Sequence, residues 1–228
     1  HPGRPRARKE PAPAFGRHDS LGSACRARAY AMTRRHSRPL GAPRGDGPRL
    51  GTLKPVTSLA NPVVKDVRAL AMRKRRAETG LFVAEGLKLL IDALDAGWRG
   101  TTVLATPAGR AGPMGERAIA GALAAGALVL EVSEAVMASV TRRDNPQAVV
   151  SVVEQRFLPL AAIDAAASTV WVALEQVRDP GNLGTIVRTV DAAGASGVIL
   201  VGDTTDPYGI EAVRATMGSI FHLGLARA

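Results

Sequence analysis

The sequence has one cysteine, Cys25, among its 228 residues. A single thiol excludes an internal disulfide and any metal site built from several thiolates. The four histidines lack the spacing of metal ligands, and we therefore expect no metal centre. No apolar run reaches about 18 residues, so no membrane-spanning segment is predicted.

Glycine loops of the common nucleotide-binding types are also missing. The sequence contains neither a G-x-G-x-x-G run nor a G-x-x-x-x-G-K-[ST] run. A nucleotide-binding α/β protein is therefore the weakest of the hypotheses kept below. Phe, Trp and Tyr together make up only 4% of the chain, so side chains able to stack on bases are scarce.

Acidic residues are few only at the amino end of the chain. Residues 1–50 hold 12 Lys and Arg against 3 Asp and Glu, a net charge of +9, whereas the other 178 residues hold 18 against 17, a net charge of +1. A basic tail can bind nucleic acid by neutralising phosphates. Such a run is more often a solvated, disordered segment, and we predict a disordered basic tail over residues 1–57.

Short helical and strand patterns alternate over residues 58–155. Asn61-Pro62 predicts a helix start, and Gly80 predicts a helix end. Strands are predicted over 81–84, 101–105, 128–132 and 148–153, and helices over 87–94 and 116–125, with a short helix capped by Ser133. This alternation predicts a compact α/β domain. The Ala-rich residues 156–168 predict a linker to a second unit.

The basic run Arg73-Lys74-Arg75-Arg76 stands out because the rest of this domain is nearly neutral. We expect it at the end of the helix that starts at Asn61, where positive charge complements the helix dipole. Four adjacent basic residues exceed what a helix end needs, which favours contact with nucleic-acid phosphates. Arg142 and Arg143 are a second, weaker candidate in a loop. Glu85 either contacts RNA or caps the next helix, and the cap is favoured.

The stretch Asp179-Pro180-Gly181-Asn182-Leu183-Gly184 separates an apolar strand pattern over 170–174 from a helical pattern that ends at Gly194. A second strand pattern over 197–201 completes a parallel βαβ unit. Such units bind ligands at the carboxyl ends of their strands. Helical periodicity places Arg188 opposite the apolar face. Asn182 and Arg188 are either site residues or, respectively, a helix cap and a surface arginine, and the residues alone leave both open.

Residues 174–194 resemble the first signature motif of the SpoU (TrmH) RNA 2′-O-ribose methyltransferases of the SPOUT superfamily. Residues 213–221 resemble the start of the second motif, and residues 80–86 and 145–147 resemble the small RNA-binding domain found ahead of the catalytic domain. The resemblance implies an N-terminal α/β RNA-binding domain over 58–155. It also implies that residues 169–228 form an incomplete parallel-sheet domain of the kind that closes as a trefoil knot.

The resemblance further implies S-adenosylmethionine as methyl donor, ribosomal RNA as substrate, a homodimer and a cytoplasmic location. It places Arg188 at the ribose 2′-hydroxyl, where it would orient the hydroxyl and stabilise the developing charge, with Asn182 fixing the substrate or the loop. Arg214 would bind RNA phosphate or support the site. Together with the run at 73–76, these residues are the predicted site.

Two motifs of the family, a Gly-Asn-Glu-type turn and an Ile-Pro-Met to Ser-Leu-Asn-Val run, are not found in the sequence. Since they form much of the cofactor pocket, we expect the cofactor-binding residues beyond Ala228 and a fragment that is inactive by itself. Three hypotheses remain: an RNA 2′-O-methyltransferase, acting on ribosomal or else transfer RNA; a non-catalytic RNA-binding module; and a nucleotide-binding protein of another kind.

Overall fold

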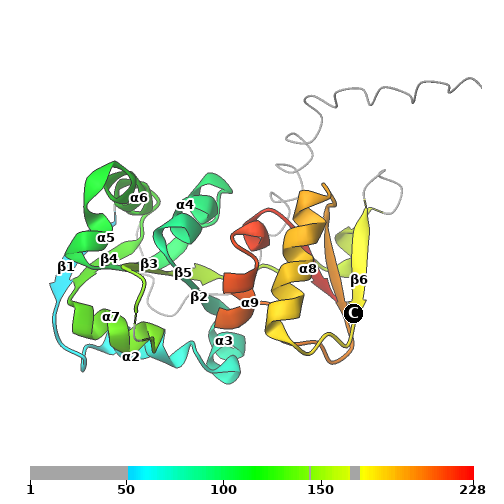
Figure 1. Cartoon of the computed structure of the whole chain (residues 1–228), viewed down its shortest axis with the longest axis horizontal. Coiled ribbons are helices and arrows are strands. Elements are labelled where there is room, and N and C mark those ends of the chain that lie inside the picture. The colour runs from blue at the N-terminus through cyan, green and yellow to red at the C-terminus, as the bar shows by residue number, and fades with distance from the viewer. Residues whose placement is uncertain (1–50, 144, 165–169) are drawn as a thin grey trace, which may run out of the picture. The chain divides into compact units, whose positions relative to one another are not determined.

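The computed structural model describes residues 51–143, 145–164 and 170–228. Most of the predicted tail and part of the predicted linker lie outside these residues. The described chain forms one five-stranded and one three-stranded sheet, and Figure 1 shows helices α3 and α9 between them. Within the described part, no helix is both long and apolar enough to cross a membrane.

The first domain is α/β, as predicted, and it begins before the predicted residue 58, since its first strand starts at Thr52. Its sheet has the order β1-β4-β3-β5-β2, and only β5 runs against its neighbours. The strands are β1 (Thr52–Val56), β2 (Leu81–Glu85), β3 (Gly100–Ala105), β4 (Leu128–Val132) and β5 (Val149–Glu154). The helices are α2 (Pro62–Ala69), α3 (Arg73–Thr79), α4 (Leu87–Asp95), α5 (Pro107–Arg110), α6 (Gly112–Ala124) and α7 (Glu134–Thr141).

Helices cover both faces of this sheet, as Figure 1 shows. On one face, Val64 and Val67 of α2 pack with Met137 of α7 and the strands beneath them. On the other, Leu90 of α4 packs with Ile119 of α6. The buried faces explain why the strands have near-continuous runs of Val and Leu.

The predicted helix boundaries are confirmed where the sequence supplies a cap. The Asn61 Oδ1 accepts a hydrogen bond from the Val63 N–H (2.9 Å), and Pro62 is the first helical residue. The Ser133 Oγ accepts from the Val136 N–H (3.3 Å) at the start of α7. Gly80 ends a helix in the left-handed conformation, with φ 66°, which glycine adopts without steric cost.

Two expectations for this domain are wrong. The pattern from Asn61 to Gly80 is two helices, because α2 ends at Ala69 and α3 begins at Arg73. The predicted tail over 1–57 also includes β1, which pairs in parallel with β4 at the edge of the sheet. The sequence does not predict β1 because its side chains are mostly exposed and include Lys54 and Pro55. Edge strands tolerate Lys and Pro, but both residues weaken the pattern by which a strand is predicted.

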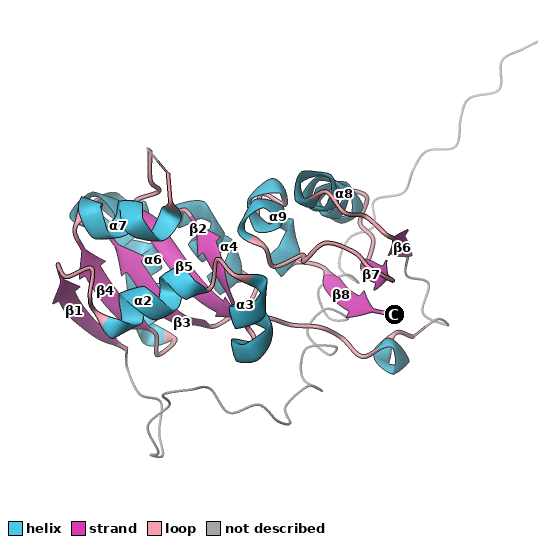
Figure 2. Cartoon of the chain, turned by 90° about the horizontal axis from the view of Figure 1, so that it is seen from below, coloured by secondary structure: helices cyan, strands magenta, loops and turns pink. Residues whose placement is uncertain are grey.

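The second unit contains the predicted parallel βαβ arrangement and one further strand. Its strands β6 (Trp171–Glu175), β7 (Gly197–Val201) and β8 (Gly224–Arg227) pair in parallel in that order. Helix α8 (Pro180–Ala192) links β6 to β7, and α9 (Ile210–Ala215) with the 3₁₀ turn η2 (Ser219–Phe221) links β7 to β8. All three strands therefore end at the same edge of the sheet (Figure 2).

The two sheets share one hydrophobic core. Phe82 of β2 contacts Tyr208, with ring centroids 4.6 Å apart, and Trp98 contacts Phe221 at 5.3 Å. The Trp98 Nε1 also donates a hydrogen bond to the Phe221 carbonyl oxygen (3.0 Å). An isolated first domain would expose Phe82 and Trp98, so the packing of each unit depends on the other.

The amino half of the predicted linker is part of this packing. Phe157 packs against the shared core, and the Leu158 N–H donates to the Leu225 carbonyl oxygen (2.7 Å) beside β8. The short 3₁₀ turn η1 (Leu160–Ala162) follows. Residues 156–158 thus fix the second unit to the first.

Candidate functional site

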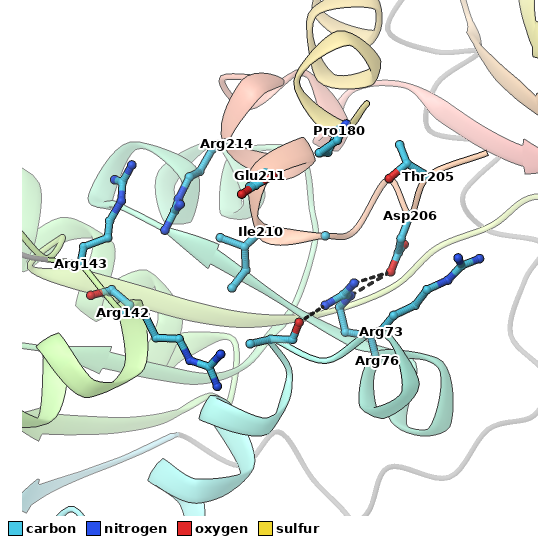
Figure 3. Close-up of a pocket in the computed structure, with 13 residues that line it drawn as sticks. Arg73, Arg76, Arg142, Arg143, Pro180, Thr205, Asp206, Ile210, Glu211 and Arg214 are labelled. Carbon is cyan, nitrogen blue, oxygen red and sulfur yellow. Dashed lines mark hydrogen bonds and ion pairs between the residues drawn. The ribbon is translucent and has the colours of Figure 1, made fainter. Parts of the chain in front are cut away.

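A cleft of about 550 Å³ lies between the two units, at the edge where the strands of the second sheet end (Figure 3). It is bordered by α3, the end of α7, the start of α9 and the loop between β7 and α9. Five of its 13 lining residues are arginines: Arg73, Arg76, Arg142, Arg143 and Arg214. Asp206 and Glu211 also line the cleft, so five arginines against two carboxylates give its lining a net charge of +3.

Helix α8 begins beside this cleft, where Pro180 is among the lining residues. Asp179 is the N-cap: its Oδ1 accepts a hydrogen bond from the Asn182 N–H (2.6 Å). The Asn182 side chain is exposed and has no hydrogen-bond partner within the described residues. The capping role left open for Asn182 thus belongs to Asp179, and the Asn182 amide is available to a ligand.

Arg188 lies two turns further along α8. Leu183, Val187 and Val190 face the core, and Arg188 is exposed on the other side, as helical periodicity predicts. No hydrogen bond or ion pair joins its guanidinium to any described residue. It is not a lining residue of the cleft, since eight residues of helix place it about 12 Å beyond Pro180 along the axis.

The glycine-containing turn brings α8 close to α9. A Cβ atom added at Gly184 would lie 2.5 Å from the Ala212 carbonyl oxygen and also meet the Ala215 side chain. Only glycine allows the two helix backbones to approach this closely. Gly184 is thus explained by helix packing, which holds the start of α8 against α9 at the cleft.

The run at 73–76 is at the beginning of a helix and not at its end. Arg73, Lys74 and Arg75 form the first turn of α3, where the helix dipole is positive. The dipole therefore disfavours these three cations, and complementing it does not account for them. The expectation of a helix end was wrong because α2 stops four residues before the run starts.

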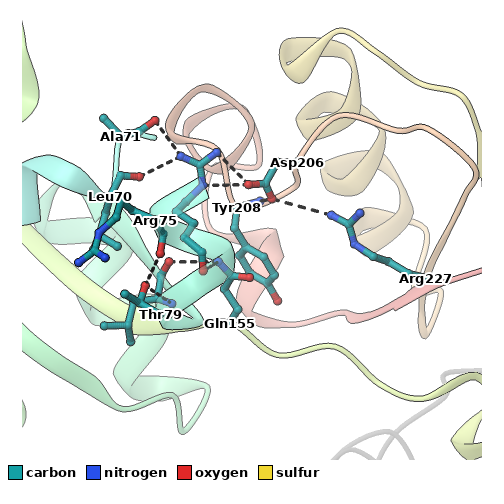
Figure 4. Close-up of polar contacts among 10 residues, drawn as sticks. Leu70, Ala71, Arg75, Thr79, Gln155, Asp206, Tyr208 and Arg227 are labelled. Atoms are coloured by element: carbon teal, nitrogen blue, oxygen red, sulfur yellow. Dashed lines mark hydrogen bonds and ion pairs between the residues drawn. The ribbon is translucent and has the colours of Figure 1, made fainter. Parts of the chain in front are cut away.

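Arg76 differs from the other members of the run because it is buried. The dashed lines that reach Leu70, Ala71 and Asp206 in Figure 4 mark its contacts. Its Nε donates to the Asp206 Oδ2 (2.8 Å), and its Nη1 donates to the carbonyl oxygens of Leu70 and Ala71 (both 2.9 Å). Asp206 follows β7, so this pair joins the two units. Arg76 is fully engaged inside the protein, which contradicts its predicted role as a free phosphate-binding side chain.

The other members of the run interact only weakly with the protein. Arg75 pairs with Glu78 at 2.9 Å, and Lys74 approaches the same carboxylate at 3.9 Å. Solvent-accessible pairs of this kind contribute little to stability. Arg73 lines the cleft and pairs with no acidic group of the described chain. It is the member of the run best placed to meet a ligand in the cleft.

Arg214 makes a second ion pair between the units. Its Nε donates to the Glu85 Oε2 (3.1 Å), and its Nη2 contacts the same oxygen. The Glu85 side chain is 1% exposed and that of Arg214 is 26% exposed. Of the two roles expected for Arg214, this ion pair favours support of the site.

The favoured role of Glu85 as a cap is wrong. The N-cap of α4 is Gly86, and no side chain caps that helix. Sequence reasoning also missed Asp206, which is 130 residues from its partner Arg76. No local pattern marks either acidic residue as a partner in an ion pair between the units.

A parallel α/β unit joined to a second α/β domain, with an arginine-lined cleft at the strand ends of the first, defines a two-domain α/β protein. Comparison with known families identifies both parts. Residues 61–151 match the MRM3-like substrate binding domain, and residues 169–228 match the SpoU rRNA Methylase family. The chain therefore contains a domain of the SpoU rRNA methylase family over residues 169–228, and this substrate-binding domain precedes it in the sequence.

Relatives with the same two parts are known. The chain is 31% identical over 175 residues to the 23S rRNA (guanosine(2553)-2′-O)-methyltransferase RlmP of Bacillus subtilis, covering 77% of this chain and 65% of that protein. It is 57% identical to an rRNA methyltransferase from Sinorhizobium meliloti of known crystal structure, with a TM-score of 0.72, covering 78% of this chain and 66% of that one.

A second crystal structure of the S. meliloti rRNA methyltransferase contains bound AdoMet. This chain is 57% identical to it with a TM-score of 0.71, covering 77% of this chain and 65% of that one. The chain thus spans somewhat less than two thirds of the length of these relatives.

Proposed function

We propose that the protein is an RNA 2′-O-ribose methyltransferase, which transfers a methyl group from S-adenosylmethionine to a ribose 2′-hydroxyl of ribosomal RNA. The proposal rests on the SpoU unit itself. Its motif helix α8 starts at the arginine-lined cleft, and the side chains of Asn182 and Arg188 on this helix have no partner among the described residues. The named relatives modify ribosomal RNA, which favours it over transfer RNA.

The reaction joins the 2′-oxygen to the methyl carbon while the bond from that carbon to sulfur breaks. When bound, S-adenosylmethionine supplies the sulfonium methyl group and accepts the electron pair of the broken bond. The hydroxyl proton leaves to solvent or to an RNA phosphate. Arg188 orients the hydroxyl and stabilises the negative charge that develops on oxygen. Asn182 positions the substrate or the loop.

The described residues fit one side of a cofactor site. The segments after β6 and β7 lie at the same sheet edge, and backbone groups turn there at Gln176 (φ 53°) and Gly202 (φ 65°). The Thr204 hydroxyl, in the second of these segments, is buried and has no hydrogen-bond partner in the described chain. Parallel sheets bind ligands at such edges.

Two further parts of the proposal rest on the family. A homodimer would complete the site, and the protein would act in the cytoplasm, where ribosomal RNA is available. Of the residues assigned to RNA, Arg73 and Lys74 are exposed and Arg75 is half-buried, so all three are accessible to a ligand. A non-catalytic RNA-binding module is the alternative, and the same basic cleft would serve it.

The catalytic role is tested by Arg188→Ala in the full-length protein. Removing a group that stabilises charge in the transition state should lower the rate of methyl transfer by about 10²–10³-fold, with little change in RNA affinity. Single-turnover transfer of a labelled methyl group measures the rate, and filter binding measures the affinity. The matched control is Arg117→Ala, an exposed arginine on α6.

A rate within a few-fold of the wild type would return Arg188 to the role of a surface residue. RNA binding without any methyl transfer by the unmodified full-length protein would instead favour the non-catalytic alternative.

A further inference from the structure

Arg142 has an unusual backbone conformation at the end of α7. It is the C-cap residue, with φ 53° and ψ 42°, in the left-handed region. A residue with a Cβ atom pays about 1–2 kcal/mol there relative to the right-handed conformation. Glycine, which has no such penalty, is the usual residue at this place in a helix end.

Glycine takes the left-handed conformation at four other helix ends of the described chain. Positive φ occurs at Gly80 after α3, at Gly97 after α4, at Gly126 after α6 and at Gly194 after α8. Arg142 and Met217, which follows α9 with φ 53°, are the two described helix ends where a residue other than glycine has a positive φ, and of these only Arg142 carries a charge. An unfavourable conformation that persists where glycine would suffice points to a role for the side chain.

The surroundings of Arg142 indicate what that role is. Arg142 and Arg143 line the cleft and also a neighbouring polar hollow of about 540 Å³, together with Asn145 and Gln147. Figure 3 shows both arginines on one side of the cleft and Arg73 on the α3 side. None of the three has an ion-pair partner among the described residues, whereas Arg76 and Arg214 do.

The chemistry of the lining selects the ligand. A guanidinium group binds phosphate through two parallel N–H donors. No aromatic side chain lines either hollow, so stacking on unpaired bases has no platform there. Phosphate groups of a folded RNA fit such a surface, because folded RNA is recognised through its backbone and shape.

We propose that Arg142 and Arg143, with Arg73 across the cleft, form a phosphate-binding site that holds the backbone of the substrate RNA between the two units. The proposal deepens the proposed function, since it takes RNA as the substrate. It extends the RNA-binding surface from the predicted basic run, of which Arg73 lines the cleft, to the end of α7.

The test is a variant that removes the Arg142 side chain and also the steric cost of its left-handed backbone conformation. Arg142→Gly in the complete chain should melt at or above the wild-type temperature, because glycine suits the left-handed conformation. It should nevertheless bind RNA more weakly. In filter-binding titrations with a 23S rRNA transcript, the slope of log K against log salt should become shallower by about 0.7–0.9 for each phosphate that the variant no longer neutralises.

The double variant Arg142→Gly with Arg143→Ala should reduce the slope by about twice as much, about 1.4–1.8. The control is Arg99→Ala with Arg117→Ala, which removes the same charge from residues outside both hollows and should leave the slope nearly unchanged. Because all variants retain the basic tail, its contribution cancels in the comparison.

An unchanged slope in the double variant, with RNA still bound, would overturn the phosphate site and leave the proposed function standing. So would an equal reduction of slope in the control pair, since that would show a response to net charge alone. Failure of the wild-type chain to bind the transcript at all would count against both. A lower melting temperature for Arg142→Gly would mean that Arg142 is structural, and Arg143→Ala alone would then decide.

Discussion

Arginines at the junction of the two units and arginines on the cleft beside it serve opposite purposes. Arg76 and Arg214 end on carboxylates of the other unit, Asp206 and Glu85, and are largely removed from water. Arg73, Arg142 and Arg143 face the cleft with no acidic partner in the described chain. The first group holds the protein together, and the second is available to a ligand.

The difference shows that a basic residue can line a ligand site and still be paired inside the protein. Arg76 is next to Arg75 in the sequence, yet the two side chains enter different environments. A buried ion pair costs desolvation and adds little net stability, but removing one partner leaves a charge buried without compensation. Such pairs hold one arrangement of the units and so keep the exposed arginines around a defined cleft.

Among these substitutions, Arg76→Ala at a buried arginine should have the largest effect on the free energy of unfolding. The substitution leaves the Asp206 carboxylate, 13% exposed, without its main partner and frees two carbonyl oxygens. We expect a decrease of about 3–5 kcal/mol in the free energy of unfolding. Urea unfolding measures it, with Arg75→Ala as the neighbouring control. A decrease below about 1 kcal/mol would mean that the pair does not hold the units together.

Glu85→Gln should have the next largest effect. The substitution keeps the shape of the side chain but removes the charge that accepts both interactions from Arg214. Hydrogen bonds to charged groups contribute about 1.5–3 kcal/mol, and we expect a decrease of that size in urea unfolding. Equal stability of the variant and the wild type would show that the Glu85 charge is dispensable.

Arg73→Ala should have the smallest effect on stability, because Arg73 belongs to the exposed arginines, whose expected role is in RNA binding. The free energy of unfolding should change by less than about 0.5 kcal/mol, as for other exposed residues. The salt slope of RNA binding should become shallower by about 0.7–0.9. The matched control is Lys74→Ala, since Lys74 belongs to the same run but does not line the cleft. Equal slopes for both variants would contradict a specific role for Arg73.

Much of the fold was predictable because its signals are local. Asn61-Pro62, Ser133 and Gly80 set helix ends through interactions within a few residues, and all three behave as predicted. β1 was missed because an exposed edge strand needs no apolar alternation. β8 was missed because four residues, Gly224–Arg227, are too few to show a period.

The candidate site was predictable in part for the same reason. The place of α8 after a strand and the exposure of Arg188 follow from periodicity and from the motif. The roles predicted for Arg76, phosphate binding, and for Glu85, helix capping, are wrong. Their actual partners, Asp206 and Arg214, are 130 and 129 residues away in the sequence. No periodic pattern carries information about an interaction across that many residues.

The sequence by itself determined the family, the α/β class, the parallel strand–helix–strand unit and the strand-end position of its motif. These depend on hydrophobic periodicity, caps and a long motif, which act over one or two elements of structure. The tertiary structure alone decided which arginines are buried and which face the cleft, that the two units share a core, and that Arg142 occupies a position suited to glycine. Burial and ion pairing depend on what packs against a side chain, and that is settled only when distant segments meet.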